Sequence, residues 1–140
     1  ATASTKGALS YLLTRVANPG ASTLDCYGLR VASTSNRMRR IDNGAATTLG
    51  AELTTGGATG DKYGMDSVGN DHTGYLYASG AWSRLGTRSD ATYTNAGPIG
   101  LAFHSADYRG DDFGGGTVVV VDPLFSSLSK KHLAWPGYRM

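Results

Sequence analysis

Aromatic residues close to predicted turns are the first residues of this 140-residue chain whose types suggest a chemistry. Aromatic rings stack on the C–H surfaces of sugars, and neighbouring polar side chains fix the orientation of the sugar. The candidate carbohydrate-binding residues are Trp82, Tyr75, Tyr77, Tyr93 and Tyr108. The alternative is structural, because Tyr75 and Tyr77 are two positions apart and would pack on one face of a strand.

Aspartates in predicted loops and at strand ends suggest a second chemistry, the binding of calcium. Calcium prefers oxygen ligands from carboxylates and carbonyls. Asp90, Asp111 and Asp112 are the candidate metal ligands. The alternative is that these carboxylates cap turns by accepting backbone N–H groups. No EF-hand loop is present, so we expect no cofactor, with calcium as the one ion to consider.

Carboxylate catalysis finds little support in the sequence. Retaining glycoside hydrolysis needs two carboxylates on either side of the scissile bond, and the chain has a single glutamate, Glu52. Asp61 and Asp66 are available as a pair, whereas Asp111 and Asp112 are adjacent and would point to opposite faces of a strand. We therefore expect a protein that is not an enzyme.

Nucleophile and metal signatures are equally weak. The chain has no G-x-S-x-G motif. Its one cysteine, Cys26, excludes an internal disulfide and is expected to be a small buried hydrophobic residue. The three histidines, His72, His104 and His132, lack the spacing of metal ligands.

The elements that must position these residues are strands. Glycine accounts for 20 of 140 residues, about twice the usual share of roughly 7%. Aspartate outnumbers glutamate, which favours turns over helices, and no segment has the apolar period of a helix. Short strand-like segments between turn signals predict an all-β antiparallel sandwich. These segments are 9–16, 27–32, 38–41, a less regular pattern over 63–68, 75–77, 99–104 and the apolar run Val118 to Val121.

Two hairpins are the clearest local predictions. The first joins Arg37–Ile41 to Ala45–Leu49 through Asp42-Asn43-Gly44, and Asn-Gly is the strongest short hairpin signal. The second joins Gly74–Ala78 to Trp82–Leu85 through Ser79-Gly80-Ala81.

The end of the chain differs from the rest. We predict one sandwich over residues 1–121 and an extended C-terminal arm over residues 122–140, beginning after the apolar valine run. The arm is too apolar for a solvated tail, so it would pack on its own sandwich or on a neighbouring subunit. Its candidate assembly residues are Leu124, Phe125, Leu128, Leu133, Trp135 and Tyr138.

Charge and hydropathy restrict the partners. The formal net charge is +2, which implies no nucleic-acid partner. No apolar run approaches the roughly 20 residues of a membrane-spanning helix.

The order of pieces from residue 60 to residue 113 resembles the C-terminal half of concanavalin A-like, laminin-G-like jelly-roll modules. The matching pieces are Gly60-Asp61, the Gly74-to-Leu85 hairpin, the run from Asp90 to Leu101, and Asp111-Asp112-Phe113. The resemblance covers roughly residues 7 to 121 and implies a jelly roll, with calcium bound in many relatives. Such modules have further N-terminal strands before the point that matches Ala1. Without them a sheet edge would be open to pairing with another chain.

Modules of this appearance, rich in Gly, Ser and Thr, are common on phage particles and bacterial surface proteins. We therefore expect a non-catalytic structural or adhesion protein on an extracellular or virion surface. A capsid-decoration or tail component within a homo-oligomer or larger assembly fits best. The alternative is a soluble, lectin-like carbohydrate-binding module.

Overall fold

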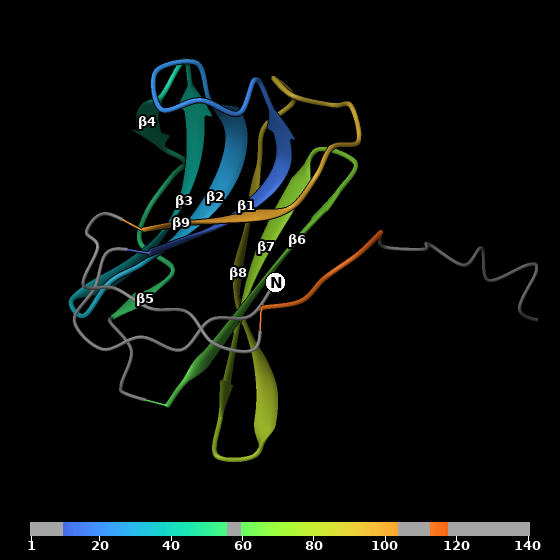
Figure 1. The fold of residues 1–140 in the computed structure, drawn as a ribbon. Helices are drawn as coiled ribbons and strands as arrows, with labels where there is room; N and C mark the ends of the chain where they lie inside the picture. Colours follow the sequence, from blue (N-terminus) through green and yellow to red (C-terminus); the bar gives the residue numbers. More distant parts are fainter. Residues whose placement is uncertain (1–9, 56–59, 104–112, 118–140) are drawn as a thin grey trace, which may run out of the picture.

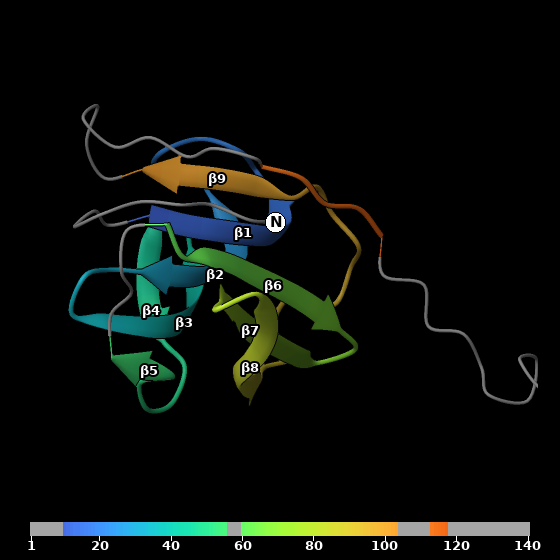
Figure 2. The same ribbon diagram turned by 90° about the horizontal axis from the view of Figure 1, so that it is seen from below.

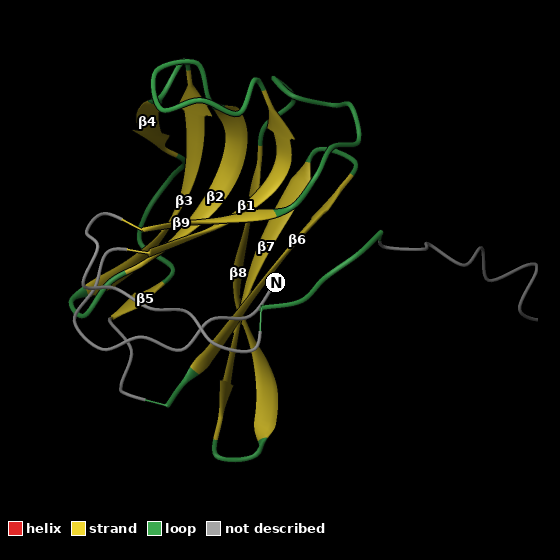
Figure 3. Cartoon of the chain, viewed as in Figure 1, coloured by secondary structure: helices red, strands yellow, loops and turns green. Residues whose placement is uncertain are grey.

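Two antiparallel β-sheets form the fold in the computed structural model, which describes residues 10–55, 60–103 and 113–117 (Figure 1). The larger sheet has the order β4-β3-β2-β1-β9, and the short β5 pairs with β3; the smaller sheet has the order β6-β7-β8. The strands are β1 (Ser10–Ala17), β2 (Asp25–Val31), β3 (Ser35–Asp42), β4 (Ala45–Thr48), β5 (Thr54–Thr55), β6 (Lys62–Val68), β7 (Asp71–Ala78), β8 (Ala81–Ser89) and β9 (Gly100–Phe103). Within these ranges there is no helix (Figure 3). The predicted all-β antiparallel sandwich is confirmed, and the predicted arm at 122–140 lies outside the described residues.

The two sheets meet where β6 lies against β1 and β2 (Figure 2). Alternate side chains of these strands point between the sheets, which is the consequence of the two-residue period of a strand. The buried cluster between the sheets contains Leu12, Tyr27, Leu29, Val31, Met38, Tyr63 and Met65. Each such apolar side chain contributes about 1.5–3 kcal/mol when it is fully buried, so this cluster holds the small sheet on the large one.

The large sheet also carries a smaller apolar cluster on its other face, built from Leu13, Cys26 and Ile41. Cys26 is fully buried, as the sequence predicted, and burial raises the pKa of its thiol to about 12. The thiol is therefore protonated at neutral pH and is a packing residue.

The first predicted hairpin is present as β3 and β4, and its turn is one residue shorter than predicted because Asp42 belongs to β3. Asp42 pairs with Ala45, which leaves Asn43 and Gly44 as a two-residue turn. Both turn residues have positive φ, 47° and 77°, as a type I′ turn requires.

The second predicted hairpin is present as β7 and β8, but its turn is shorter than predicted. Ala78 pairs with Ala81, so the turn is Ser79-Gly80 alone, and Ala81 belongs to β8. Ser79 and Gly80 both have positive φ, 53° and 82°. A two-residue turn of this kind matches the right-handed twist of the strands, and the hairpin it closes extends well beyond the sandwich (Figure 1).

Candidate functional site

The outer face of the small sheet carries an ordered array of aromatic and polar side chains. Tyr63 and Met65 of β6 point into the core, so the alternate residues of that strand point outward. Cross-strand pairing sets the rows of the array. From the hairpin end inward, the rows are Lys62–Tyr77–Trp82, Gly64–Tyr75–Arg84, Asp66–Thr73–Thr87 and Val68–Asp71–Ser89.

A β-bulge in β8 makes the array possible. Gly74 pairs with Gly86, and Tyr75 pairs with Arg84, so Leu85 is an extra residue in β8. Arg84 and Thr87 are three positions apart and would lie on opposite faces of a regular strand. The bulge returns both to the outer face. A side chain at Gly86 would approach Leu53 Cδ2 to 3.1 Å, so glycine suits this position.

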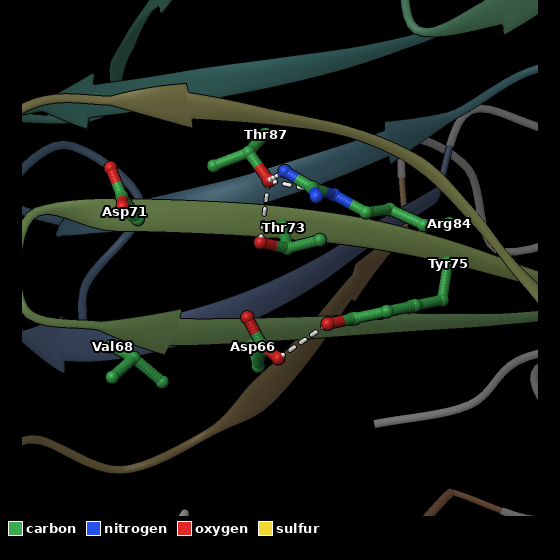
Figure 4. A pocket seen from close by; sticks show the side chains of 7 residues that line it. All are labelled: Asp66, Val68, Asp71, Thr73, Tyr75, Arg84 and Thr87. Carbon is green, nitrogen blue, oxygen red and sulfur yellow. Dashed lines mark hydrogen bonds between the residues drawn. The ribbon is translucent and has the colours of Figure 1, made fainter.

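Polar side chains of the second and third rows form two hydrogen-bonded groups, a relay of Arg84, Thr87 and Thr73 between β8 and β7, and the pair Tyr75 and Asp66 between β7 and β6 (Figure 4). Arg84 donates from Nε to Thr87 Oγ1 at 3.1 Å, and its Nη2 donates to the same oxygen. The hydroxyls of Thr87 and Thr73 are 2.8 Å apart. The relay thus starts at a cation and runs through two threonines toward β6.

Tyr75 and Asp66 form the β6 end of this surface. The Tyr75 hydroxyl donates to Asp66 Oδ2 at 2.8 Å. Burial and the hydrogen bond to Asp66 raise the pKa of Tyr75, and a hydrogen bond from Thr73 partly offsets this. Asp66 therefore keeps Tyr75 protonated and fixed in one orientation.

These side chains surround a shallow depression of about 300 Å³, which Val68 and Asp71 complete (Figure 4). Asp71 accepts a hydrogen bond from the Ser89 hydroxyl. The depression has a threonine floor, two carboxylates and one guanidinium. It can offer both donors and acceptors to a ligand without moving the backbone.

Trp82 lies beside this depression and is half exposed, with 50% of its surface accessible. Its ring is tilted against Tyr77, with centroids 5.3 Å apart. Gly64 makes room for it, because a Cβ at that position would lie 3.2 Å from Trp82 Cζ3. The indole therefore reaches across the sheet toward β6 while one side remains open to solvent.

A second polar network lies between the sheets and is largely buried. Tyr27 and His72, both fully buried, stack with ring centroids 3.6 Å apart. The Tyr27 hydroxyl donates to Asp90 Oδ1 at 2.6 Å, and His72 Nε2 lies 3.1 Å from the Asp90 carbonyl oxygen. Because a carbonyl only accepts, Nε2 carries the proton. Burial lowers the pKa of His72 and outweighs its bond to Asp90, so the ring is neutral.

Ser67 and His72 are close enough to resemble a nucleophile and its base, at 2.8 Å between Oγ and Nδ1. The Ser67 hydroxyl also lies 2.7 Å from Thr14 Oγ1. Thr14, Ser67 and His72 thus form a chain of hydrogen bonds that ends on a backbone carbonyl. This chain satisfies buried polar groups, which is sufficient reason for its geometry.

Asp90 also joins the network to the large sheet. Arg40 Nη1 donates to Asp90 Oδ2 at 2.8 Å, and Arg40 Nε donates to Asp42 Oδ2 at 2.9 Å. Burial would raise the pKa of Asp90, but hydrogen bonds from Tyr27, Thr92 and Arg40 lower it well below the usual range. Tyr93 donates its hydroxyl to Asp42. Burial, together with the hydrogen bonds to Asp42 and Asp25, raises the pKa of Tyr93.

A larger hollow of about 550 Å³ lies between the end of β1, the edge of β6, the 94–99 loop and residues 115–117. Three of its polar side chains, those of Thr14, Arg15 and Ser67, are already engaged with the protein. Arg15 donates to the carbonyl oxygens of Tyr93 and Gly69 at 2.7 and 2.6 Å, and Ser67 contacts His72. Asp66, Thr94 and Thr117 also line this hollow, but among the described residues no aromatic side chain does, so it lacks a stacking surface for a sugar.

The structure brings Trp82, Tyr75 and Tyr77 together on one exposed face, as the carbohydrate hypothesis requires. Tyr93 lies elsewhere, in the network with Asp42. Tyr108, Asp111, Asp112 and the six assembly residues of the predicted arm lie outside the described residues. The sequence interpretation missed the polar partners of the aromatic residues, although Thr73 could have been found from its spacing of two from Tyr75.

The calcium hypothesis for Asp90 stays a prediction. Both carboxylate oxygens of Asp90 already accept hydrogen bonds, and one of the donors is the Arg40 cation. Among the described residues, no three His, Cys, Asp or Glu side chains are grouped so that they could hold a metal ion.

Comparison of the chain with protein-family models, with curated proteins and with solved structures finds no match. In the described ranges no helix has the length and hydropathy to cross a membrane.

Proposed function

We propose that this protein is a non-catalytic extracellular adhesion module that binds glycans on the outer face of its small sheet. The observation that carries the proposal is the position of half-exposed Trp82 beside the preoriented relay of Arg84, Thr87 and Thr73. Glycans present apolar C–H faces and hydroxyls that both donate and accept hydrogen bonds. An exposed aromatic ring next to fixed polar groups matches both features.

The order of sequence pieces supports a finer assignment within this proposal. We propose that the sandwich is related to concanavalin A-like, laminin-G-like jelly rolls, and the antiparallel two-sheet fold is compatible with that origin. Calcium binding belongs to the same proposal, and it is tested by measuring glycan binding with and without a chelator.

Substitution of Trp82 tests the glycan proposal. Trp82→Ala is expected to abolish retention of the protein on a panel of immobilised glycans, while its thermal midpoint changes little because the ring is half exposed. Phe103→Ala on β9 is the matched control, since Phe103 is also an exposed aromatic residue, at 38%, but lies on the other sheet. Retention that Trp82→Ala leaves unchanged would remove the outer face as the site.

A structural role in an extracellular particle, such as a virion capsid-decoration or tail component, is the second candidate. One observation favours it: among the described strands, β6 and β8 each pair on one side only. Open edges of this kind accept strands from other chains. Light scattering with and without a chelator tests it. A stable multimer that loses its assembly when residues 122–140 are deleted supports this role, and a monomer contradicts it.

A further inference from the structure

We infer that the ligand of the outer face is a neutral oligosaccharide lying along β7, with one sugar on Trp82 and another over the depression, and that the depression rejects anionic sugars. This inference rests on the proposed glycan-binding function and adds the length and charge of the ligand.

The length follows from the register of the sheet. Trp82 pairs with Tyr77, and the floor of the depression is the pair Thr73 and Thr87. The backbone of Trp82 is therefore four residues, about 13 Å, along β7 from Thr73. The indole itself reaches Gly64, which pairs with Tyr75, two residues or about 7 Å from Thr73. A sugar stacked on the indole therefore leaves the threonine pair to the next sugar of the chain. A chain of sugars that follows the strand contacts both.

The directions of the hydrogen bonds define what the depression offers. Thr87 Oγ1 accepts two bonds from Arg84, so its own proton is directed to Thr73. Asp66 uses Oδ2 to accept from Tyr75. Among the hydrogen bonds of the described residues, Asp66 engages through Oδ2 and Arg84 through Nε and Nη2, and none involves Asp66 Oδ1 or Arg84 Nη1. An acceptor and a donor are thus left on either side of the threonine floor, an arrangement that suits sugar hydroxyls.

The charges of the depression favour neutral ligands. Asp66 and Asp71 carry two negative charges around it, against the single positive charge of Arg84. Arg84 is held toward Thr87, which limits its use as a clamp for a carboxylate. Lys62 is in the adjacent row, beside Tyr77, and does not line the depression. A uronate or sulfated sugar in the depression would therefore meet net repulsion.

Calorimetric titration of the full chain tests this inference. The neutral probes are hexasaccharides of β-1,4-glucan, β-1,3-glucan, β-1,4-xylan and β-1,4-mannan with their monosaccharides, and the acidic probe is hexagalacturonate. At least one neutral hexasaccharide is expected to bind at least tenfold more tightly than its monosaccharide and than hexagalacturonate. Asp66→Asn is expected to weaken that binding about tenfold, because a hydrogen bond to a charged group is lost.

Removal of the two negative charges of the depression gives the most discriminating measurement. Asp66→Asn combined with Asp71→Asn is expected to raise the affinity for hexagalacturonate while lowering that for the neutral ligand. Glu52→Gln is the matched control, since Glu52 is an exposed carboxylate that pairs with Arg37 in another part of the molecule. It is expected to change neither affinity.

The outcomes separate the two proposals. Equal binding of neutral and acidic hexasaccharides, or binding that needs Trp82 but is indifferent to Asp66→Asn, overturns the inference and leaves the glycan function standing. Tight binding of monosaccharides overturns the length argument. Absence of binding to every probe overturns both the inference and the proposed function.

Discussion

The two polar networks of this molecule are similar in composition and opposite in placement. Each combines an arginine, an aspartate and hydroxyl groups. In the interior, Arg40 and the Tyr27 hydroxyl both donate to Asp90. On the outer face, Arg84 donates to Thr87, whose hydroxyl contacts Thr73, and Tyr75 donates to Asp66. The interior network connects β2, β3 and β7; Tyr27 and His72 are fully buried in it, and Arg40 is partly exposed at its edge. The outer relay lies within one sheet, with Thr73 buried at its base and Arg84 exposed to solvent. The comparison teaches that burial, rather than residue type, separates polar groups that stabilise the fold from those available to a ligand.

The largest expected effect on stability comes from removing the aspartate of the interior network, and removal of the aspartate on the outer face is the matched comparison. Asp90→Ala leaves the partly buried Arg40 and the Tyr27 hydroxyl without their partner, and we expect a loss of about 3 kcal/mol in the free energy of unfolding. Asp66→Ala removes one bond at the surface and is expected to cost about 1 kcal/mol or less. Urea denaturation of both variants measures the difference. Equal losses would show that the two networks do not differ in this way.

The pH dependence of stability is expected to come from the interior network. Because the pKa of His72 is lowered in the folded state, protons bind more readily to the unfolded chain below its ordinary value of about 6.5. The contribution of His72 to stability is therefore fully present above that pH and decreases as the solution becomes more acidic. The lowered pKa of Asp90 adds a further loss below about pH 4.

Thermal midpoints from pH 8 to pH 3 check this expectation, and His72→Gln is expected to flatten the part between pH 7 and pH 5. A nuclear magnetic resonance titration of His72 is the independent control, because it needs no variant. An imidazole that becomes protonated at pH 6.5 or above in the folded protein would contradict the sign of the effect.

A smaller effect is expected at Gly64, which affects the outer face alone. Gly64→Ala places a methyl group about 3.2 Å from the Trp82 ring, so the ring must tilt away while the core is left intact. We expect a shifted Trp82 fluorescence maximum, a few-fold weaker glycan binding and an unchanged midpoint of unfolding. Gly114→Ala is the matched control, since a Cβ there meets no atom within 4 Å. An unaltered fluorescence spectrum would mean that the indole does not depend on this gap.

Local sequence signals predicted the strands and turns well, because period-two patterns and Asn-Gly or Ser-Gly pairs act over a few residues. The same period placed Tyr75 and Tyr77 on one face. The bulge at Leu85 could not be predicted, since an extra residue in one strand is defined only against its partner. Asp90 contacts Tyr27 across 63 positions, so its role depends on how the sheets pack. For the same reason, nothing in the sequence placed Tyr93 in the interior network, and it was predicted to bind sugar on the aromatic surface.

The bulge in β8 has one more consequence, which concerns how this surface can change by mutation. It changes the alternation of the strand: the outward-facing residues are Trp82 and Arg84 before it and Thr87 and Ser89 after it, so their numbers are even on one side and odd on the other. Deletion of Leu85 alone would leave Arg84 two positions before Thr87, and a regular strand would then keep the array on the outer face with its pairing to β7 unchanged. This strand can therefore lose one residue at the bulge and keep the array, whereas a one-residue deletion in a regular strand turns every residue beyond it to the other face.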